Sequence, residues 1–291
     1  MSRASVPKLM LFVLLTTIPA AILRLTLESP TLGLQLLAGP MGALAGEALL
    51  RRSAASLRDG SALLTGWLLA LALPASAGAA LTAFGGALAI ALGKAPFGGL
   101  GRNPFNPAMV GYAAILVLFP LASVDGMSGA TPLAALASRE GLTLSEWLKT
   151  QPGPWGTGPG LALSLAFLAG GAALLLRRAI PWHAPAGFLL GLLGAAVLAY
   201  DDGGSSSAGH PLFHLFSGSA LFAAFFIITD PVSGAHTPPG RLAMGVLAGA
   251  LTVLFRSQGP FPDGVAFAVL LANGAGPALD ALAEGRRQSR A

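Results

Sequence analysis

SALLTGWLLALALP, at residues 61–74, is an uncharged apolar run that begins at a serine and ends at a proline. A similar run, SALFAAFFIITDP, occupies residues 219–231 in the second half of the chain. The pair Pro104-Phe105 recurs as Pro260-Phe261 at nearly the same offset. These two agreeing offsets predict two repeats of five helices each. Because five is an odd number, the second repeat would enter the membrane from the opposite side, as in many transporters.

The composition predicts a chain that faces lipid. Hydrophobic residues make up 54% of the 291 residues and charged residues only 10%, whereas a soluble domain carries roughly 25% charged residues. We therefore expect an all-α polytopic membrane protein of about ten transmembrane helices, arranged as two inverted five-helix repeats. The predicted spans are 9–27, 32–50, 61–73, 78–92, 105–121, 159–176, 183–200, 212–229, 241–255 and 264–282.

These spans predict three parts: a first membrane repeat at 1–121, a connecting loop at 122–157 and a second membrane repeat at 158–291. The first apolar run also fits a signal peptide. No small-x-small cleavage site closes it, so we expect it to be retained as a transmembrane helix.

The positions of Lys and Arg predict the orientation. With the N-terminus in the cytoplasm, most of the 17 Lys and Arg residues fall in cytoplasmic segments, and only Arg24, Arg139, Lys149 and Arg256 fall outside. We therefore expect both termini in the cytoplasm and the 122–157 loop outside it. The net charge of +5 then has a topological cause, so no nucleic-acid partner is expected. The absence of cysteine excludes thiolate-held iron–sulfur clusters within the chain.

Two segments point to a redox function. DGMSGATP, at residues 125–132, places three small residues before Thr131, although by itself it also fits an ordinary turn. GGLGRNPFNPAMVGY, at residues 98–112, is the second segment. Together they resemble the D subunit of the Rnf ion-translocating electron transport complexes, and more distantly the B subunit of the sodium-pumping NADH:quinone reductases. The stretches 211–215, 225–233 and 262–271 resemble the same family.

The resemblance implies that Thr131 bears covalent FMN through a phosphoester, which a separate flavin transferase would attach. The loop that carries Thr131 is the most polar stretch of the chain, and long loops usually serve function. Its alternative interpretation is a solvated connector. The family pattern Asp-x-x-Ser/Thr-Gly-Ala-Thr is filled by Asp125, Ser128, Gly129, Ala130 and Thr131.

The 98–106 stretch combines helix-breaking residues with two amides. We interpret Gly99, Asn103 and Asn106 as candidates for holding a flavin ring edge or a partly dehydrated cation, because amides supply both donors and acceptors. The alternative is that the asparagines cap a helix and the glycines form a turn. The resemblance also implies a second flavin, non-covalent riboflavin. A Rossmann dinucleotide site is excluded here because the glycine spacing is wrong and no soluble strand precedes it.

Ionisable residues beside apolar runs are further candidates for binding an ion or the second flavin. Thr229 and Asp230 end one such run, and Asp230 would bind a cation, pair with Arg241 or cap the next turn. Lys94 would neutralise a reduced flavin, or extend its ammonium to the membrane interface. Glu47 and Arg51 are spaced for an ion pair on one helix.

The remaining polar residues predict ordinary roles. Three histidines near predicted membrane boundaries, His183, His210 and His214, are weak evidence for a metal, and we expect neither a metal site nor a catalytic residue in this chain. Asp263 is expected to cap the last helix. Asp201 and Asp202 are expected to form a solvated turn.

The function implied by the resemblance is a membrane subunit of a ferredoxin/NAD oxidoreductase complex. It would pass electrons across the membrane, coupled to movement of Na⁺ or H⁺. Its partners would be the lipid bilayer, the flavin transferase and other subunits of the complex, including an outer-face FMN subunit. Two alternatives stay open: the B subunit of a sodium-pumping NADH:quinone reductase, and a channel or transporter without redox chemistry, for which inverted repeats alone would suffice.

Overall fold

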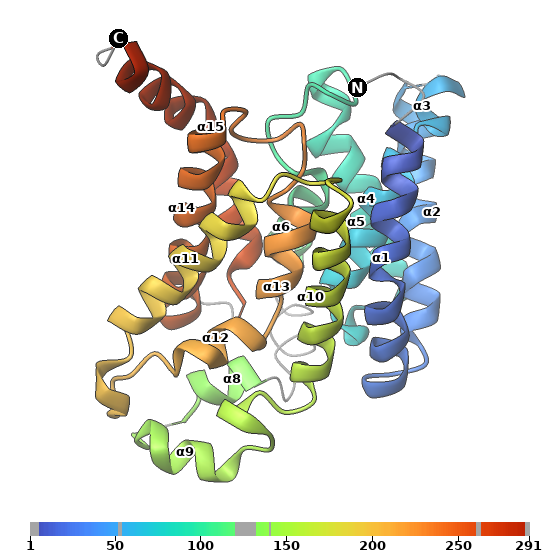
Figure 1. Cartoon of the computed structure of the whole chain (residues 1–291). Helices are drawn as coiled ribbons and strands as arrows, with labels where there is room; N and C mark the ends of the chain where they lie inside the picture. Colours follow the sequence, from blue (N-terminus) through green and yellow to red (C-terminus); the bar gives the residue numbers. More distant parts are fainter. Residues whose placement is uncertain (1–5, 52–53, 120–131, 140, 260–262, 289–291) are drawn as a thin grey trace. The chain divides into compact units, whose positions relative to one another are not determined.

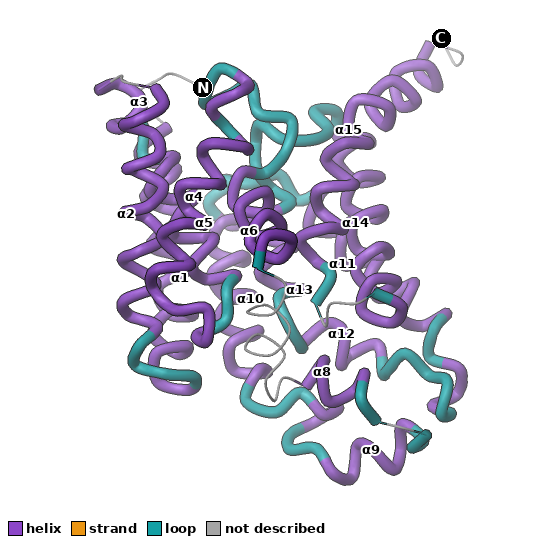
Figure 2. The backbone as a smooth tube through the Cα atoms, turned by 180° about the vertical axis from the view of Figure 1, so that it is seen from behind, coloured by secondary structure: helices purple, strands orange, loops and turns teal. Residues whose placement is uncertain are grey.

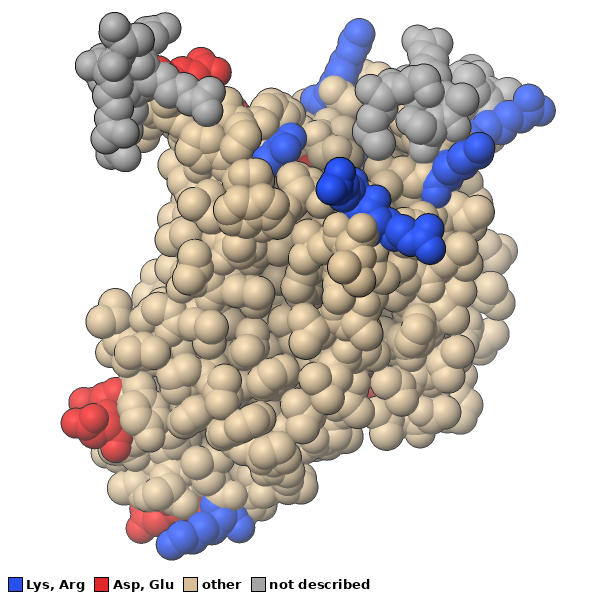
Figure 3. Space-filling model, in the orientation of Figure 1, with Lys and Arg blue, Asp and Glu red and all other residues tan. Residues whose placement is uncertain are grey.

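The computed structural model describes residues 6–51, 54–119, 132–139, 141–259 and 263–288. Within these ranges every regular element is a helix and none is a strand (Figure 2). Most of the visible surface in Figure 3 belongs to residues other than Lys, Arg, Asp and Glu. Helices long and apolar enough to cross a membrane occupy Val6–Leu27, Leu32–Leu50, Ala75–Phe97, Pro238–Gln258 and Val265–Gly285, and four shorter apolar helices lie between them. The chain is therefore a multi-pass membrane protein.

The chain divides into two compact units. Unit 1 comprises residues 1–127 and 170–179, and unit 2 comprises residues 128–169 and 180–291. Each unit is described by itself.

Unit 1 is a bundle in which α2 packs along α5 (Figure 1). The contact is close because small residues face each other: a Cβ added at Gly42 would lie 1.8 Å from the carbonyl oxygen of Ala83. The helices of this unit are α1 (Val6–Leu27), α2 (Leu32–Arg51), α3 (Ala54–Arg58), α4 (Ser61–Ala72), η2 (Ala75–Ala77), α5 (Gly78–Gly93), η3 (Ala95–Phe97) and α6 (Pro107–Leu118).

Unit 2 repeats this type of contact between α11 and α14. A Cβ added at Gly191 of α11 would lie 2.1 Å from the carbonyl oxygen of Val246 in α14. Its helices are α8 (Pro132–Ala137), α9 (Leu144–Thr150), η4 (Pro154–Gly156), α10 (Gly160–Leu176, whose last turns belong to unit 1), α11 (His183–Leu198), η5 (Asp201–Gly203), α12 (Pro211–Phe216), α13 (Ala220–Phe222), η6 (Ala223–Ile227), α14 (Pro238–Gln258) and α15 (Val265–Gln288).

One predicted span is wrong as a single helix. The 212–229 run is interrupted at Ser217–Ser219, where Gly218 adopts a φ of +63°. The chain then resumes as α13 and continues as a π-helical turn, η6. The other predicted spans each contain a helix, although α6 is shorter than its predicted run and α14 is longer. The run at 78–92 was predicted almost to its ends, since α5 covers Gly78–Gly93.

Candidate functional site

The predicted flavin motif lies mostly outside the described residues: this applies to Thr131 and to its neighbours Asp125, Ser128, Gly129 and Ala130. The described chain resumes at Pro132, the residue directly after Thr131, where α8 begins. The residues that follow, 132–139 and 141–158, we term the α8–α9 segment. Its structure determines where the polypeptide after Thr131 lies within unit 2.

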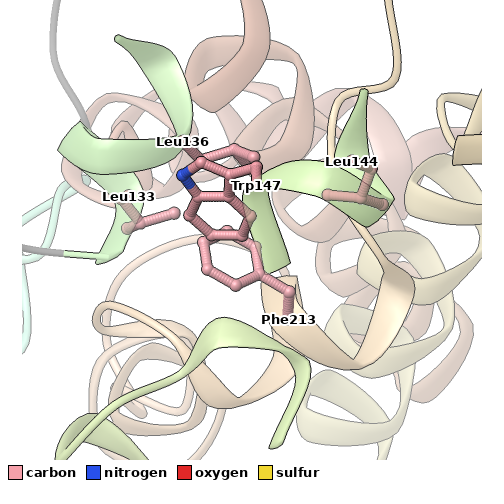
Figure 4. Close-up of a cluster of buried hydrophobic side chains, with 5 residues drawn as sticks. All are labelled: Leu133, Leu136, Leu144, Trp147 and Phe213. Carbon is pink, nitrogen blue, oxygen red and sulfur yellow. The ribbon is translucent and has the colours of Figure 1, made fainter. Parts of the chain in front are cut away.

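The α8–α9 segment is folded around a hydrophobic core, so the interpretation as a solvated connector is wrong for these residues. Trp147 is 2% exposed, and its ring meets that of Phe213 edge-on at 5.5 Å (Figure 4). The indole Nε1 donates to the carbonyl oxygen of Ala135 at 3.2 Å. This core fastens α8 and α9 to α12. Its buried members are Leu133, Leu136, Leu144, Trp147 and Phe213.

Polar contacts fix the rest of the segment. Thr143 and Glu146 form a reciprocal capping box at the start of α9. Because the Thr143 hydroxyl and N–H both donate to the Glu146 carboxylate, they hold the pKa of Glu146 below its usual range. Arg139 donates to the carbonyl oxygens of Ser205 and Ser207.

The start of α8 also lies beside the break in the 212–229 run. A Cβ added at Gly218 would lie 2.6 Å from Leu133 Cδ1, and 2.8 Å from both Arg256 Nη2 and Asp263 Oδ2. Leu133 is separated from Thr131 by a single residue. The described chain that follows Thr131 therefore begins next to the ion pair of Arg256 and Asp263.

That ion pair and Ser219 form the break. Arg256 Nη2 lies 3.0 Å from Asp263 Oδ1, and Arg256 also donates to the carbonyl oxygens of His214 (2.6 Å) and Ser217 (3.1 Å). Asp263 Oδ2 accepts from the N–H (2.8 Å) and the hydroxyl (2.5 Å) of Ser219. Asp263 thus binds the start of α13, which corrects the prediction that it caps the last helix.

Lys94 is buried, so the prediction that it extends to the membrane interface is wrong. It is 2% exposed, and its Nζ donates to Glu47 Oε2 at 2.7 Å and to Ser61 Oγ at 2.6 Å. Ser61 in turn donates its hydroxyl and its N–H to Asp59 Oδ1, at 2.5 and 2.8 Å. Glu47 was expected to pair with Arg51, whose side chain is not among those described. The described partner of Glu47 is Lys94.

The 98–106 stretch has the backbone that its glycines predicted. Gly98, Gly99 and Gly101 all have φ near +90°. Asn106 accepts from the N–H groups of residues 108 and 109 and so caps α6, and Asn103 donates to the carbonyl oxygen of Phe105 at 3.1 Å. Both side chains are 4% exposed. Asn106 therefore has the helix-capping role that was the alternative interpretation of this stretch. A role for these groups in binding a flavin or a cation stays a prediction.

Asp230 and Thr229 make local hydrogen bonds. Asp230 Oδ1 accepts from the N–H of Val232 at 3.0 Å, which is the capping role among its three alternatives. Arg241 donates instead to the carbonyl oxygen of Ala235. The Thr229 hydroxyl donates to the carbonyl oxygen of Phe225. Ion binding at these residues stays a prediction.

The other predicted polar residues have separate places. His210 Nδ1 accepts the N–H of Leu212 at the start of α12, and His214 contacts the carbonyl oxygen of Ala208. No group of three or more potential metal ligands occurs among the described residues. Asp201 and Asp202 are exposed in η5, as predicted.

Sequence reasoning missed the buried arginines. Arg24 donates to the carbonyl oxygens of Leu71 (2.6 Å) and Leu73 (3.1 Å) at the end of α4, and pairs with Glu28 at 2.5 Å. Arg24 and Arg256 are 5% and 8% exposed. The charge pattern could have indicated them. Arg24 and Arg256 are among the few basic residues predicted outside the cytoplasm, and each lies near the end of an apolar helix.

Comparison with known proteins identifies the family. A family model described as "NQR2, RnfD, RnfE family" matches residues 1–288. The chain belongs to this family. A relative from Pseudomonas aeruginosa (strain UCBPP-PA14) is 42% identical, and the match covers 94% of this chain and 89% of that protein. A relative from Cellvibrio japonicus is 39% identical over 94% of this chain and 88% of its own, and one from Vibrio vulnificus is 37% identical over 96% and 94%. Each is named as the D subunit of an ion-translocating oxidoreductase complex.

Proposed function

We propose that this chain is the membrane-embedded D subunit of an Rnf-type ion-translocating oxidoreductase complex, and that it carries FMN on Thr131. The observation that carries the proposal is the similarity to proteins of that name along nearly the whole chain, at 42% identity over 94% of its length. The family description also covers the related quinone reductase subunits. The three relatives described above are named as D subunits, which favours the Rnf type.

The described residues fit a covalent flavin at Thr131. The polypeptide directly after it is anchored, because Leu133 and Leu136 are buried in the core around Trp147. The FMN would supply one- and two-electron chemistry. The role of the chain is to hold this group at a fixed place in unit 2, between an outer-face flavin of a neighbouring subunit and carriers closer to the cytoplasm.

The proposal includes ten spans in two inverted repeats. Both units pack their second and fourth long helices through glycines, at Gly42 and Gly191. Both begin their third helix at a serine bound by a carboxylate, at Ser61 and Ser219. An odd number of helices per repeat would invert the second unit relative to the first.

The remaining parts of the proposal concern ligands, partners and place. Gly99, Asn103 and Asn106 would hold a non-covalent riboflavin, and Lys94, Thr229 and Asp230 are the candidates for ion coupling by Na⁺ or H⁺. The partners are the other subunits of the complex, including one with an outer-face FMN, and a flavin transferase during maturation. The chain would lie in the bacterial inner membrane, with the Thr131 loop in the periplasm.

Flavin fluorescence on a denaturing gel tests the covalent FMN. Purified protein should give a fluorescent band, and its intact mass should include one added flavin phosphate. Thr131→Ala should abolish both signals while the protein still inserts. Thr150→Ala, at an exposed threonine in the same loop, should keep both. A dark wild-type band of unmodified mass would reject the flavoprotein assignment.

A membrane assay tests the complex. Membranes that lack the gene should lose ferredoxin-dependent NAD reduction, and a sodium dependence of the wild-type activity would identify the coupling ion. Quinone reduction by NADH in place of that activity would favour the B subunit of a quinone reductase. Transport without any flavin would favour the channel or transporter.

A further inference from the structure

An aromatic stack lies at the end of the α8–α9 segment and has no role in the function proposed so far. The ring of Trp155 lies 5.8 Å from that of Phe216 at an interplanar angle of 16°, and 6.5 Å from that of His210 at 12°. Tyr200 meets His210 edge-on at 5.7 Å. The His210 ring is fixed in orientation because its Nδ1 accepts the N–H of Leu212. The rings of Trp155, Phe216 and His210 are therefore nearly parallel and form a preorganised aromatic stack.

Trp155 is held there at a conformational cost. Its φ of +55° lies in the left-handed region, which a bulky residue rarely adopts. Gly153 and Gly156 on either side also have positive φ. Gly156 is locked against the core, since a Cβ added there would lie 2.8 Å from Trp147 Cζ3. Strained conformations persist where the surrounding structure enforces them, and they cluster at ligand-binding sites.

The strain does not serve to bury the ring, because Trp155 remains 36% exposed. Trp147, in the same segment, is 2% exposed and forms the core. The two tryptophans therefore have different roles. Trp147 stabilises the segment, while Trp155 presents part of a large aromatic ring outside it.

The polypeptide next to Thr131 runs close to this stack. A Cβ added at Gly158 would lie 3.9 Å from Pro132 Cγ, and Pro132 follows Thr131 directly. Gly158 is three residues from Trp155, a separation that spans at most about 10 Å of chain. The described chain that follows Thr131 thus begins beside the loop that carries Trp155, in the same unit.

We propose that the stack of Trp155, Phe216 and His210 receives the isoalloxazine ring of the FMN carried on Thr131. This inference rests on the proposed function. The ribityl phosphate arm extends the flavin ring away from its threonine, and a planar tricyclic ring gains most from offset contact with a large aromatic surface. Trp155 is then a flavin-binding residue, and His210 and Phe216 position it.

Flavin fluorescence yield tests the contact, because a stacked tryptophan quenches an excited flavin and phenylalanine does so weakly. Trp155→Ala should raise the fluorescence per bound FMN severalfold at unchanged FMN content. Trp155→Phe keeps an aromatic ring for packing and should raise it as well. Trp182→Ala is the matched control: Trp182 is also exposed and stacked on a histidine, His183, at 4.1 Å, and its removal should change nothing.

The outcomes separate this inference from the proposed function. Wild-type protein without FMN would reject the function and the inference together. A normal FMN content with equal fluorescence in wild type, Trp155→Ala and Trp155→Phe would reject the inference alone. If Trp155→Ala acquires no FMN, the fluorescence per bound FMN of Trp155→Phe tests the contact: an increase supports it and no change rejects it.

Discussion

Ser61 and Ser219 are bound in the same way, although they lie in different units. In each case one carboxylate oxygen accepts both the N–H, at 2.8 Å, and the hydroxyl, at 2.5 Å. The carboxylate belongs to Asp59 for Ser61 and to Asp263 for Ser219. A buried cation from the end of the fourth long helix of the unit completes each arrangement: Lys94 after α5, and Arg256 in α14. The two serines that marked the repeat in the sequence therefore also share their chemistry.

This relationship predicts unequal effects of removing the two carboxylates. Asp59→Ala should cost about 1.5–3 kcal/mol, the usual net effect of losing hydrogen bonds to a charged group, because Lys94 still binds Glu47. Asp263→Ala should cost about 3–5 kcal/mol, because it also leaves the buried guanidinium of Arg256 without its counter-ion. Thermal unfolding in detergent would measure both. Glu284→Ala, at an exposed site on α15, should have no effect, and equal losses for the two aspartates would contradict the assignment of Arg256 to Asp263.

The ion pair of Lys94 and Glu47 predicts strong coupling between the two residues. Lys94→Met removes the ammonium that lies 2.7 Å from the Glu47 carboxylate, and breaking this buried pair should cost about 3–5 kcal/mol of unfolding free energy. Adding Glu47→Leu should restore most of the loss, since a buried pair can be replaced by apolar side chains at little cost. A double-mutant cycle on unfolding midpoints measures the coupling. If the double variant is no more stable than Lys94→Met, the pair is not the dominant interaction.

The sequence was sufficient to predict where most helices lie, but not where a helix is interrupted. The helix at 78–92 follows from its apolar run alone, and α5 confirms that helix. The break at Ser217–Ser219 depends on Asp263, which is 44 residues beyond Ser219, so no local pattern contains it. The core of the α8–α9 segment likewise uses Phe213 from outside the loop. The motif that indicated the function could be recognised as a pattern of residues, whereas the contacts around it depend on partners distant in sequence.

The capping box of α9 predicts a pH dependence. Hydrogen bonds from Thr143 lower the pKa of Glu146, so the ionised carboxylate stabilises the start of α9 above its ordinary pKa. That contribution is lost as the pH falls through the lowered value. A carboxyl NMR titration should therefore find Glu146 titrating below a free glutamate, and Thr143→Val should raise its pKa towards the ordinary range. Thr150→Val, at the opposite end of α9, should leave it unchanged. An ordinary pKa in the wild type would show that the cap does not form.

The absence of cysteine allows a direct test of the topology. Single cysteines at two exposed sites, Arg58→Cys in α3 and Ser145→Cys in α9, should lie on opposite sides, because α4, α5 and α6 separate them. In intact cells a membrane-impermeant maleimide should label only Ser145→Cys, and permeabilised cells should be labelled at both, since basic segments remain in the cytoplasm. The test is sharp because α4 and α6 have only 12 residues each, against the roughly 20 needed to cross alone. If the two cysteines are labelled from opposite sides, the non-helical residues flanking α4 and α6 must complete the crossings. If both are labelled from the same side, one of these two helices does not span the membrane, and the first repeat cannot have five spans.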